Sequence, residues 1–256
     1  MLTGGAGADV LIGEAGRDRI YGGENADQLF GEVGDDILIA GSGNDNVRAG
    51  NDDDIVIGGA DTDMLYGDAG NDLISGGTGN DLIFGGLGND QLAGSTGDDS
   101  ILGEIGDDII SGGDGIDTID GGAGIDVISG DKGNDILAGG DGNDCYIFKA
   151  GDGEDEITDQ GGSLDVIRFI DLDVANINFT KSANDLVISF TGSSDKITIK
   201  DSFSGNNLNS TIEVLEFTNT AIDGGSAIDL SAVTYDEVGD NFNYQTTNNI
   251  SDDVTL

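Results

Sequence analysis

The chain has 256 residues, of which 51 are acidic and 9 basic, and its formal net charge of −42 would repel nucleic acid and anionic membranes and favour cations as partners. It contains no His and a single Cys, Cys145, which excludes a Ser-His-Asp triad, a Cys-His dyad, a conventional zinc site and an intramolecular disulfide. No apolar segment reaches the length of a membrane span, and the N-terminus lacks the basic and apolar parts of a secretory signal peptide.

Residues 4 to 147 read as sixteen consecutive copies of the pattern G-G-x-G-x-D-x-U-x, in which U is a large apolar residue. A disordered acidic segment would also combine low hydrophobicity with high charge. Disorder requires only composition, however, whereas aspartates and apolar residues held two positions apart in a fixed phase indicate a repeated structural unit. The sixteen aspartates are Asp9, Asp18, Asp27, Asp36, Asp45, Asp54, Asp63, Asp72, Asp81, Asp90, Asp99, Asp108, Asp117, Asp126, Asp135 and Asp144.

The sequence starts in the middle of a repeat. Met1, Leu2 and Thr3 fit the last three positions of a repeat whose loop is missing. Because a solenoid needs a terminal cap to cover its open core, we expect that more repeats, a cap or another domain precede this sequence in the native protein.

The nine-residue period predicts a solenoid in which two repeats form one coil. Positions seven to nine are expected to form a short strand whose middle residue, U, points inward. Repeats n and n+2 would stack at the strand spacing of about 4.8 Å, which places Asp9 over Asp27 and builds two ladders of carboxylates. The loop would turn at residues with positive φ in the first and fourth positions, where Asn25, Asp52 and Asp61 replace Gly in the fourth. The second position is less restricted.

The two ladders predict bound metal. Two unit charges about 5 Å apart repel by roughly 3 kcal/mol at an effective dielectric constant of about 20. One apolar core residue per repeat does not offset this repulsion together with the entropy of ordering the chain. Carboxylate and carbonyl oxygens without imidazole or thiolate favour calcium over zinc or copper, and their flexible mixture suits calcium better than magnesium. Folding and calcium binding are then expected to be one equilibrium.

The repeats resemble the RTX (repeats-in-toxin, haemolysin-type) calcium-binding nonapeptide over residues 4–147. The resemblance implies an all-β, right-handed parallel β-roll in which each calcium ion lies between one loop and the loop two repeats later. The earlier loop would give the carbonyls of its second and fourth positions and its aspartate, and the later loop the carbonyls of its first and third positions and its aspartate. Eight loops on each edge leave seven gaps, hence up to about fourteen calcium ions.

The resemblance assigns ligands to each gap. A site whose fourth position is Asn25, Asp52 or Asp61 departs from the pattern and is expected to be weaker. Three of the implied ligand sets are Gly5, Gly7 and Asp9 with Gly22, Glu24 and Asp27; Glu14, Gly16 and Asp18 with Gly31, Val33 and Asp36; and Gly77, Gly79 and Asp81 with Gly94, Thr96 and Asp99.

After residue 147 the period is lost, and alternating apolar segments predict half-buried strands at 166–169, 186–190, 196–199 and 212–217. Residues 148–220 are expected to form a β-rich region that caps the roll of residues 1–147, and the stretch 151–218 resembles the segment that often follows RTX arrays. Residues 221–256 are expected to be a polar tail. Its end, Asp252-Asp253-Val254-Thr255-Leu256, resembles the uncleaved signal of type I secretion substrates, apart from Thr255, with an ordinary frayed terminus as the alternative.

Three functions are compatible with these features. The first is a non-catalytic, calcium-responsive folding module of a secreted, extracellular bacterial protein that uses the type I secretion machinery. The second is an enzyme with a carboxylate pair, but the repeat already explains nearly every aspartate and no G-x-S-x-G motif occurs, so a catalytic domain would more readily lie upstream. The third is an adhesion or cell-surface module, because apolar residues would form an outward stripe on each sheet. These residues are Ile12, Phe30, Tyr66, Phe84 and Leu102 in one sheet, and Ile37, Ile55, Leu73, Ile109 and Val127 in the other.

Overall fold

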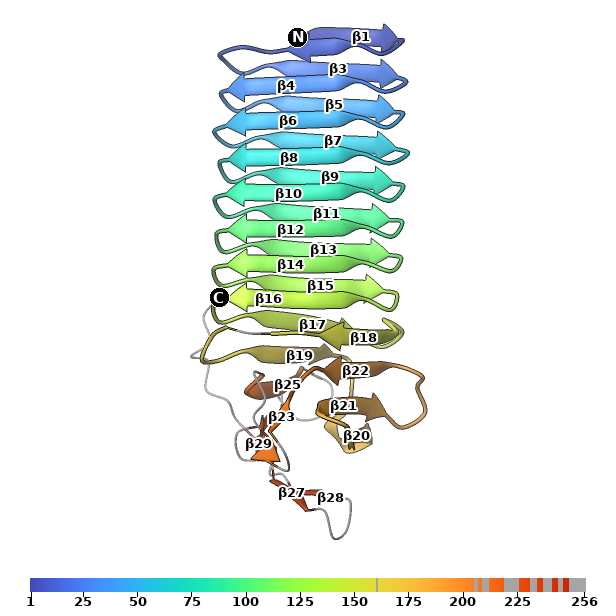
Figure 1. Ribbon diagram of the computed structural model, residues 1–256, viewed down its shortest axis with the longest axis vertical. Helices are drawn as coiled ribbons and strands as arrows, with labels where there is room; N and C mark the ends of the chain where they lie inside the picture. Colours follow the sequence, from blue (N-terminus) through green and yellow to red (C-terminus); the bar gives the residue numbers. More distant parts are fainter. Residues whose placement is uncertain are drawn as a thin grey trace.

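The structure, a computed structural model, describes residues 1–159, 161–204, 207–208, 212–218, 226–230, 234–236, 241–243 and 246–248. The chain coils into a tall stack in which strands of two parallel sheets alternate along the sequence (Figure 1). This parallel β-solenoid, followed by a smaller β-rich region, confirms the predicted all-β fold. The proposed secretion signal at residues 252–256 lies outside the described residues.

Strands with odd numbers form most of the first sheet, and strands with even numbers form most of the second. The first sheet contains, in order, β1 (Leu2–Ala6), β3 (Arg19–Glu24), β5 (Ile37–Ser42), β7 (Ile55–Ala60), β9 (Leu73–Thr78), β11 (Gln91–Thr96), β13 (Ile109–Asp114), β15 (Val127–Lys132), β17 (Cys145–Lys149), β19 (Val166–Ile170), β25 (Val214–Thr218), β26 (Ser226–Asp229) and β29 (Thr246–Asn248). The second contains β2 (Val10–Ile12), β4 (Gln28–Val33), β6 (Asn46–Asn51), β8 (Met64–Ala69), β10 (Leu82–Leu87), β12 (Ser100–Ile105), β14 (Thr118–Ala123), β16 (Ile136–Asp141), β18 (Glu154–Ile157), β22 (Lys196–Ile199), β21 (Asp185–Phe190) and β20 (Ile177–Ser182).

The strands of the array are longer than the three residues expected from the sequence. From β3 to β16 each strand has six residues, which are positions seven to nine of one repeat and positions one to three of the next. Residues pair with residues eighteen positions later, as in Ile83 with Ile101, so repeats n and n+2 stack as predicted. The extension arises because the residues of positions one to three also pair with the same positions two repeats later.

The U residues fill the space between the two sheets. Their side chains from Ile20 to Tyr146 are at most 3% exposed, whereas Leu11, in the first full repeat, is half-buried. Neighbours in positions seven and nine point outward, because side chains alternate between the faces of a strand. Ile109 is 56% exposed, for example, and Ile110 only 1%. The core is therefore one layer of apolar residues along the whole stack.

The expectation that glycines in the first position adopt positive φ is wrong. Positive φ occurs in the second and fourth positions, where Glu14, Ser95 and Asn25 have φ of 69°, 86° and 77°. The first position favours glycine for another reason, which is space, and Ala40 and Ala49 are its two exceptions. A Cβ atom on Gly4 would lie 2.5 Å from Oδ2 of Asp9 and 2.7 Å from the carbonyl oxygen of Gly22.

Both sheets continue across residue 147 into the C-terminal region. Strand β19 pairs in parallel with β17, and β18 pairs in parallel with β16, before β20, β21 and β22 add antiparallel pairs. The predicted strands at 166–169, 186–190 and 196–199 are thereby confirmed, and the fourth begins two residues later than expected, at Val214. Short strands β23 (Phe203–Ser204), β24 (Asn207–Leu208), β27 (Thr234–Asp236) and β28 (Asn241–Asn243) and the 3-10 helix Val174–Asn176 complete the described elements.

Four aromatic rings pack together where the core of the array continues into the C-terminal region. The ring of Phe169 stacks on Phe217 with centroids 4.8 Å apart, meets Phe190 edge-on at 5.2 Å and lies 6.3 Å from Phe148. All four side chains are buried. This cluster supplies apolar cover where the single layer of U residues ends. In the part of the chain that the structure describes, no helix has the length and apolar character needed to cross a bilayer.

Candidate metal centres

The array aspartates form two ladders, one along each edge of the roll. The main-chain nitrogen of Asp9 donates a hydrogen bond of 2.8 Å to Oδ1 of Asp27. The same bond, 2.6–2.9 Å long, joins every array aspartate to the one eighteen residues later. The sequence-predicted partners in all fourteen gaps are therefore brought together, and one carboxylate oxygen of each later aspartate is fixed.

The second carboxylate oxygen, Oδ2, has no hydrogen-bond partner among the described residues at nearly every array position. From Asp27 to Asp144 the array aspartates are at most 3% exposed. Among the described residues, Oδ2 of every array aspartate except Asp18 is buried without a hydrogen bond. An ionised oxygen buried in this way is strongly unfavourable unless a cation or a proton accompanies it.

Burial makes protonation easier at these positions. It raises the pKa of Asp54, Asp63 and Asp126 to about 7, although a main-chain hydrogen bond to each carboxylate acts in the opposite direction. Neighbouring aspartates of the same ladder raise the pKa values further. A cation held between two such carboxylates would oppose both effects, because its positive charge favours the ionised form of each carboxylate and lowers its pKa.

Carbonyl oxygens lie beside the unpartnered oxygens. A Cβ atom on Gly22 would be 2.6 Å from Oδ2 of Asp27 and 2.5 Å from the carbonyl oxygen of Ala40, and Gly58 faces Asp63 and Gly76 in the same way. The aspartate of one loop and the first-position carbonyl two repeats later thus share a small space that a side chain would fill. These are two of the ligands that the sequence predicted for each gap.

The third-position carbonyls among the predicted ligands already accept one hydrogen bond each. Gly7 donates to the carbonyl of Glu24 at 3.2 Å, and Gly79 donates to that of Thr96 at 2.9 Å. A carbonyl oxygen has two lone pairs, so one stays available for a cation. Within the described ranges no three acidic, His or Cys side chains form a metal-binding group. Each gap therefore offers two carboxylates and main-chain carbonyls, an all-oxygen set that suits calcium.

Comparison with known families agrees with this chemistry. A model of the family described as RTX calcium-binding nonapeptide repeat (4 copies) matches residues 3–38, 30–65, 57–92, 85–119 and 111–144, which together cover more than half of the chain. The chain belongs to the RTX calcium-binding repeat family. Residues 185–223 match a second family, described as haemolysin-type calcium binding protein related domain.

Comparison with individual proteins adds little to the family assignment. No curated protein matches the chain. Among solved structures the chain is similar in part to the extracellular lipase LipA from Serratia marcescens, with 18% sequence identity and a TM-score of 0.25. The similarity covers 60% of this chain but only 37% of the lipase chain.

The RTX ladders extend beyond the repeats recognised in the sequence. Asp135 donates from its main-chain nitrogen to Oδ1 of Asp155 at 2.9 Å, and Asp144 donates to Oδ1 of Asp165 at 2.8 Å. The spacings are 20 and 21 residues instead of 18, so a search at fixed phase misses both aspartates. A signal was present, because residues 150–158 read A-G-D-G-E-D-E-I-T, which is the repeat pattern displaced by two residues.

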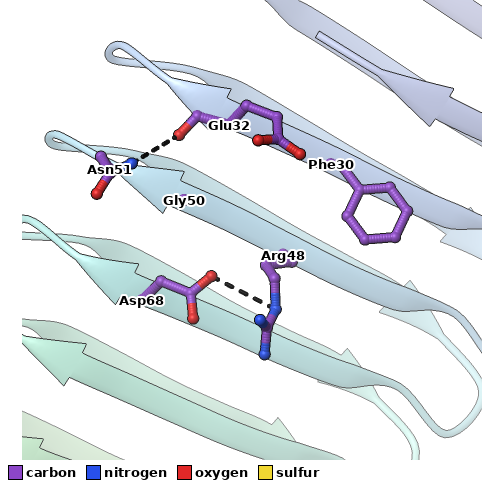
Figure 2. A pocket seen from close by; sticks show the side chains of 6 residues that line it. All are labelled: Phe30, Glu32, Arg48, Gly50, Asn51 and Asp68. Atoms are coloured by element: carbon purple, nitrogen blue, oxygen red, sulfur yellow. Dashed lines mark hydrogen bonds and ion pairs between the residues drawn. The ribbon is translucent and has the colours of Figure 1, made fainter. Parts of the chain in front are cut away.

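A shallow hollow of about 320 Å³ lies on the outer face of the second sheet of the RTX roll. It is lined by Phe30, Glu32, Arg48, Gly50, Asn51 and Asp68, from β4, β6 and β8 (Figure 2). Nε of Arg48 lies 3.4 Å from Oδ2 of Asp68, and its guanidinium lies over the ring of Tyr66. Tyr66 in turn stacks on Phe84, with centroids 4.8 Å apart. Arg48 thus interrupts the predicted apolar stripe between Phe30 and Tyr66.

Proposed function

We propose that this chain is a non-catalytic module of a secreted bacterial protein that folds when calcium binds between its loops. The observation that supports this proposal most directly is the series of buried Oδ2 atoms, on every array aspartate except Asp18, that have no hydrogen-bond partner in the described part of the chain. A fold that buries a ladder of unpaired carboxylates is disfavoured at neutral pH until cations enter. The metal would supply positive charge and coordination, and the loops would supply oxygen ligands at both sides of each gap.

The array aspartates leave little room for catalysis. From Asp27 to Asp144 each contributes one oxygen to a main-chain hydrogen bond and offers the other to a gap, as Asp81 and Asp99 do. We therefore propose the sequence-derived ligand sets as calcium ligands rather than as general acids or bases. A catalytic domain, if the native protein has one, would lie outside this sequence.

The concentration of calcium would decide where the module folds. Extracellular calcium modules typically have dissociation constants of roughly 10⁻⁴ to 10⁻³ M. With such affinities the chain would remain expanded in the bacterial cytosol, pass the type I secretion machinery unfolded, and fold after leaving the cell. Folding outside would also hinder return of the chain.

A circular dichroism titration tests the proposal. The chain is placed in excess chelator at neutral pH and then titrated with calcium, with magnesium, and with a monovalent salt at equal ionic strength. We expect β-structure to appear with calcium, less readily with magnesium, and not with the monovalent salt, because screening alone leaves the buried oxygens unpaired. Full β-structure in chelator at neutral pH, or a dissociation constant far below about 10⁻⁶ M, would contradict the proposal.

The outer hollow favours a second candidate function, which is adhesion to a surface or partner. Phe30 and Arg48 offer an apolar ring and a cation next to acidic and amide groups. The variant Phe30→Ser/Phe84→Ser should then reduce retention of the calcium-folded chain on bacterial cells, while Ile109→Ser on the first sheet serves as the control. Equal retention of all three proteins would dismiss the adhesion function.

A further inference from the structure

At the junction between the RTX array and the C-terminal region, one aspartate ladder continues by one more pair, Asp144 and Asp165, whose gap is called a step below. We propose that this step, between Asp144 and Asp165, is a calcium site whose ligands include the hydroxyl group of Tyr146. The inference rests on the calcium binding proposed above. It extends that binding to a place where neither the repeat spacing nor the family match, which ends at residue 144, assigns a site.

The main chain at the junction has the same arrangement as in the regular gaps. Asp144 donates to Oδ1 of Asp165 at 2.8 Å, and Val166 donates to the carbonyl of Asp144 at 2.8 Å. One step earlier, Asp126 donates to Oδ1 of Asp144 at 2.9 Å, and Cys145 donates to the carbonyl of Asp126 at 2.8 Å. The longer connection therefore returns an aspartate to the ladder in register.

Each aspartate of this step has one buried carboxylate oxygen without a hydrogen-bond partner among the described residues. Asp144 is 1% exposed and Asp165 is fully buried. Oδ2 of each makes no hydrogen bond to the described residues. As in the regular gaps, two buried negative charges lie without a compensating positive charge, and a divalent cation would supply it.

Tyr146 makes the donor set of this step different. It occupies a U position, and its ring is fully buried in the core. In regular gaps the first-position glycine faces an aspartate oxygen and a carbonyl oxygen, as Gly4 does. At Gly139 a Cβ atom would instead meet Oδ2 of Asp144 and, at 2.7 Å, the hydroxyl oxygen of Tyr146. Among the described residues, the main chain of Gly139 is the group that approaches this hydroxyl as a donor, and no hydrogen bond of good geometry forms. The hydroxyl oxygen would therefore supply a neutral ligand in place of a carbonyl.

Acidic groups surround the step on its C-terminal side. Asp165 donates from its nitrogen to Oε2 of Glu213 at 2.8 Å, and Glu213 donates from its nitrogen to the carbonyl of Asp165 at 3.0 Å. Asp159 is 5% exposed, so it is a further buried carboxylate in this region, and it acts electrostatically on Asp165 together with Glu213. The surroundings thus attract a cation more strongly than two carboxylates alone.

A cation here would connect three parts of the sequence. Asp144 precedes β17, Asp165 precedes β19, and Glu213 precedes β25, and these strands are neighbours in the first sheet. The hydrogen bonds along this ladder span 21 and 48 residues. Calcium at the junction would therefore join the C-terminal region to the last repeat.

Terbium(III) is a suitable probe, because it replaces calcium at oxygen-rich sites and emits when a nearby tyrosine ring transfers excitation energy to it. The full chain is folded with calcium, titrated with terbium, and excited through tyrosine. Wild type is compared with Tyr146→Phe, Asp165→Asn and Asp120→Asn, an exposed aspartate outside the loops. Calcium stoichiometry is measured on the same proteins by equilibrium dialysis.

We expect strong sensitised emission from wild type and Asp120→Asn. Emission from Asp165→Asn should fall to the level of Tyr146→Phe, and Asp165→Asn should bind one calcium ion fewer than wild type. Wild-type emission and stoichiometry in Asp165→Asn would overturn the site. If Asp165→Asn loses its calcium-induced β-structure, the variant Tyr146→Phe tests the site instead. It removes only the hydroxyl oxygen and keeps the aromatic ring that packs in the core. Unchanged calcium affinity and stoichiometry in Tyr146→Phe would then overturn the role of the hydroxyl. Absence of any calcium-induced folding in wild type contradicts the proposed function instead, and the junction is still judged by its terbium emission.

Discussion

The main-chain nitrogen of Asp81 donates a hydrogen bond of 2.8 Å to Oδ1 of Asp99, eighteen residues later in the chain. This bond fixes the carboxylate of Asp99, whose Oδ2 makes no hydrogen bond to any residue that the structure describes. Asp99 in turn donates to Oδ1 of Asp117 at 2.8 Å. Each interior aspartate therefore belongs to two gaps, and its loss should affect both.

Replacing Asp99 with Asn tests this double role. Asp99→Asn keeps the hydrogen bond from Asp81 but removes one negative charge from two adjacent gaps. We expect calcium affinity at these gaps to fall about tenfold or more, or about 1.4 kcal/mol, as measured by calorimetric titration. The neighbouring Asp98 is exposed, and its Oδ1 accepts a bond from Ile116 that Asn can also accept. Asp98→Asn is therefore the matched control, and equal losses in both variants would contradict the ladder.

Acid should favour the fold when calcium is absent. The pKa values of Asp63 and Asp126 rise from the ordinary value of 3.8 to about 7 in the folded chain, first because of burial. The folded state therefore binds protons more tightly than the unfolded state, and this contribution is fully present below about pH 4 and lost as the pH rises through 7. In excess chelator, β-structure measured by circular dichroism should decrease between about pH 4 and pH 8. An increase over this range would show that the sign is wrong.

Space in the first position should control cation binding. Gly58→Ala would place a methyl group 2.5 Å from Oδ2 of Asp63 and 2.6 Å from the carbonyl of Gly76. We expect weaker calcium binding at that gap. The natural Ala49 offers the opposite change, because Ala49→Gly enlarges the space in its own loop. Calcium titrations of both variants should shift in opposite directions, and a shift in the same direction would contradict the steric argument.

The buried U residues should carry the apolar stabilisation. Ile110 is 1% exposed and its neighbour Ile109 is 56% exposed, so the same substitution can be compared on the two sides of one strand. Ile110→Ala should lower the free energy of unfolding in saturating calcium by about 2–5 kcal/mol. Ile109→Ala should change it by less than about 0.5 kcal/mol. Urea unfolding at fixed calcium measures both, and similar values would mean that the core is not where the structure places it.

The sequence was sufficient for the features that follow the strict period. The pairing of Asp9 with Asp27 and the burial of residues such as Ile20 follow from two repeats per coil and from alternation along a strand. The same reasoning did not find Asp155 and Asp165, because insertions shift their phase while the sheets still bring them into register. Only the pairing of strands β17 and β19 shows that a spacing of 21 residues is equivalent to one of 18.

The role of glycine also required coordinates. From sequence, the nearly invariant first position indicates a turn with positive φ, and the variable second position indicates a weaker restriction. In the structure, Glu14 and Glu32 take positive φ in the second position, while the first is limited by the space beside the aspartate. A glycine required for positive φ and a glycine required for space look identical in a sequence. The backbone angle and the neighbouring atoms in the structure distinguish the two cases.

Each strand of the roll pairs only with the strands directly above and below it in its sheet. The contacts that hold one turn are therefore made with its neighbouring turns, unlike those in a globular core. A pulling force applied to one end would detach one turn at a time. Each turn would release eighteen residues, which extend to about 60 Å of chain. The end-to-end length of the chain would thus increase in equal steps, and similar contacts between neighbouring turns would resist each step.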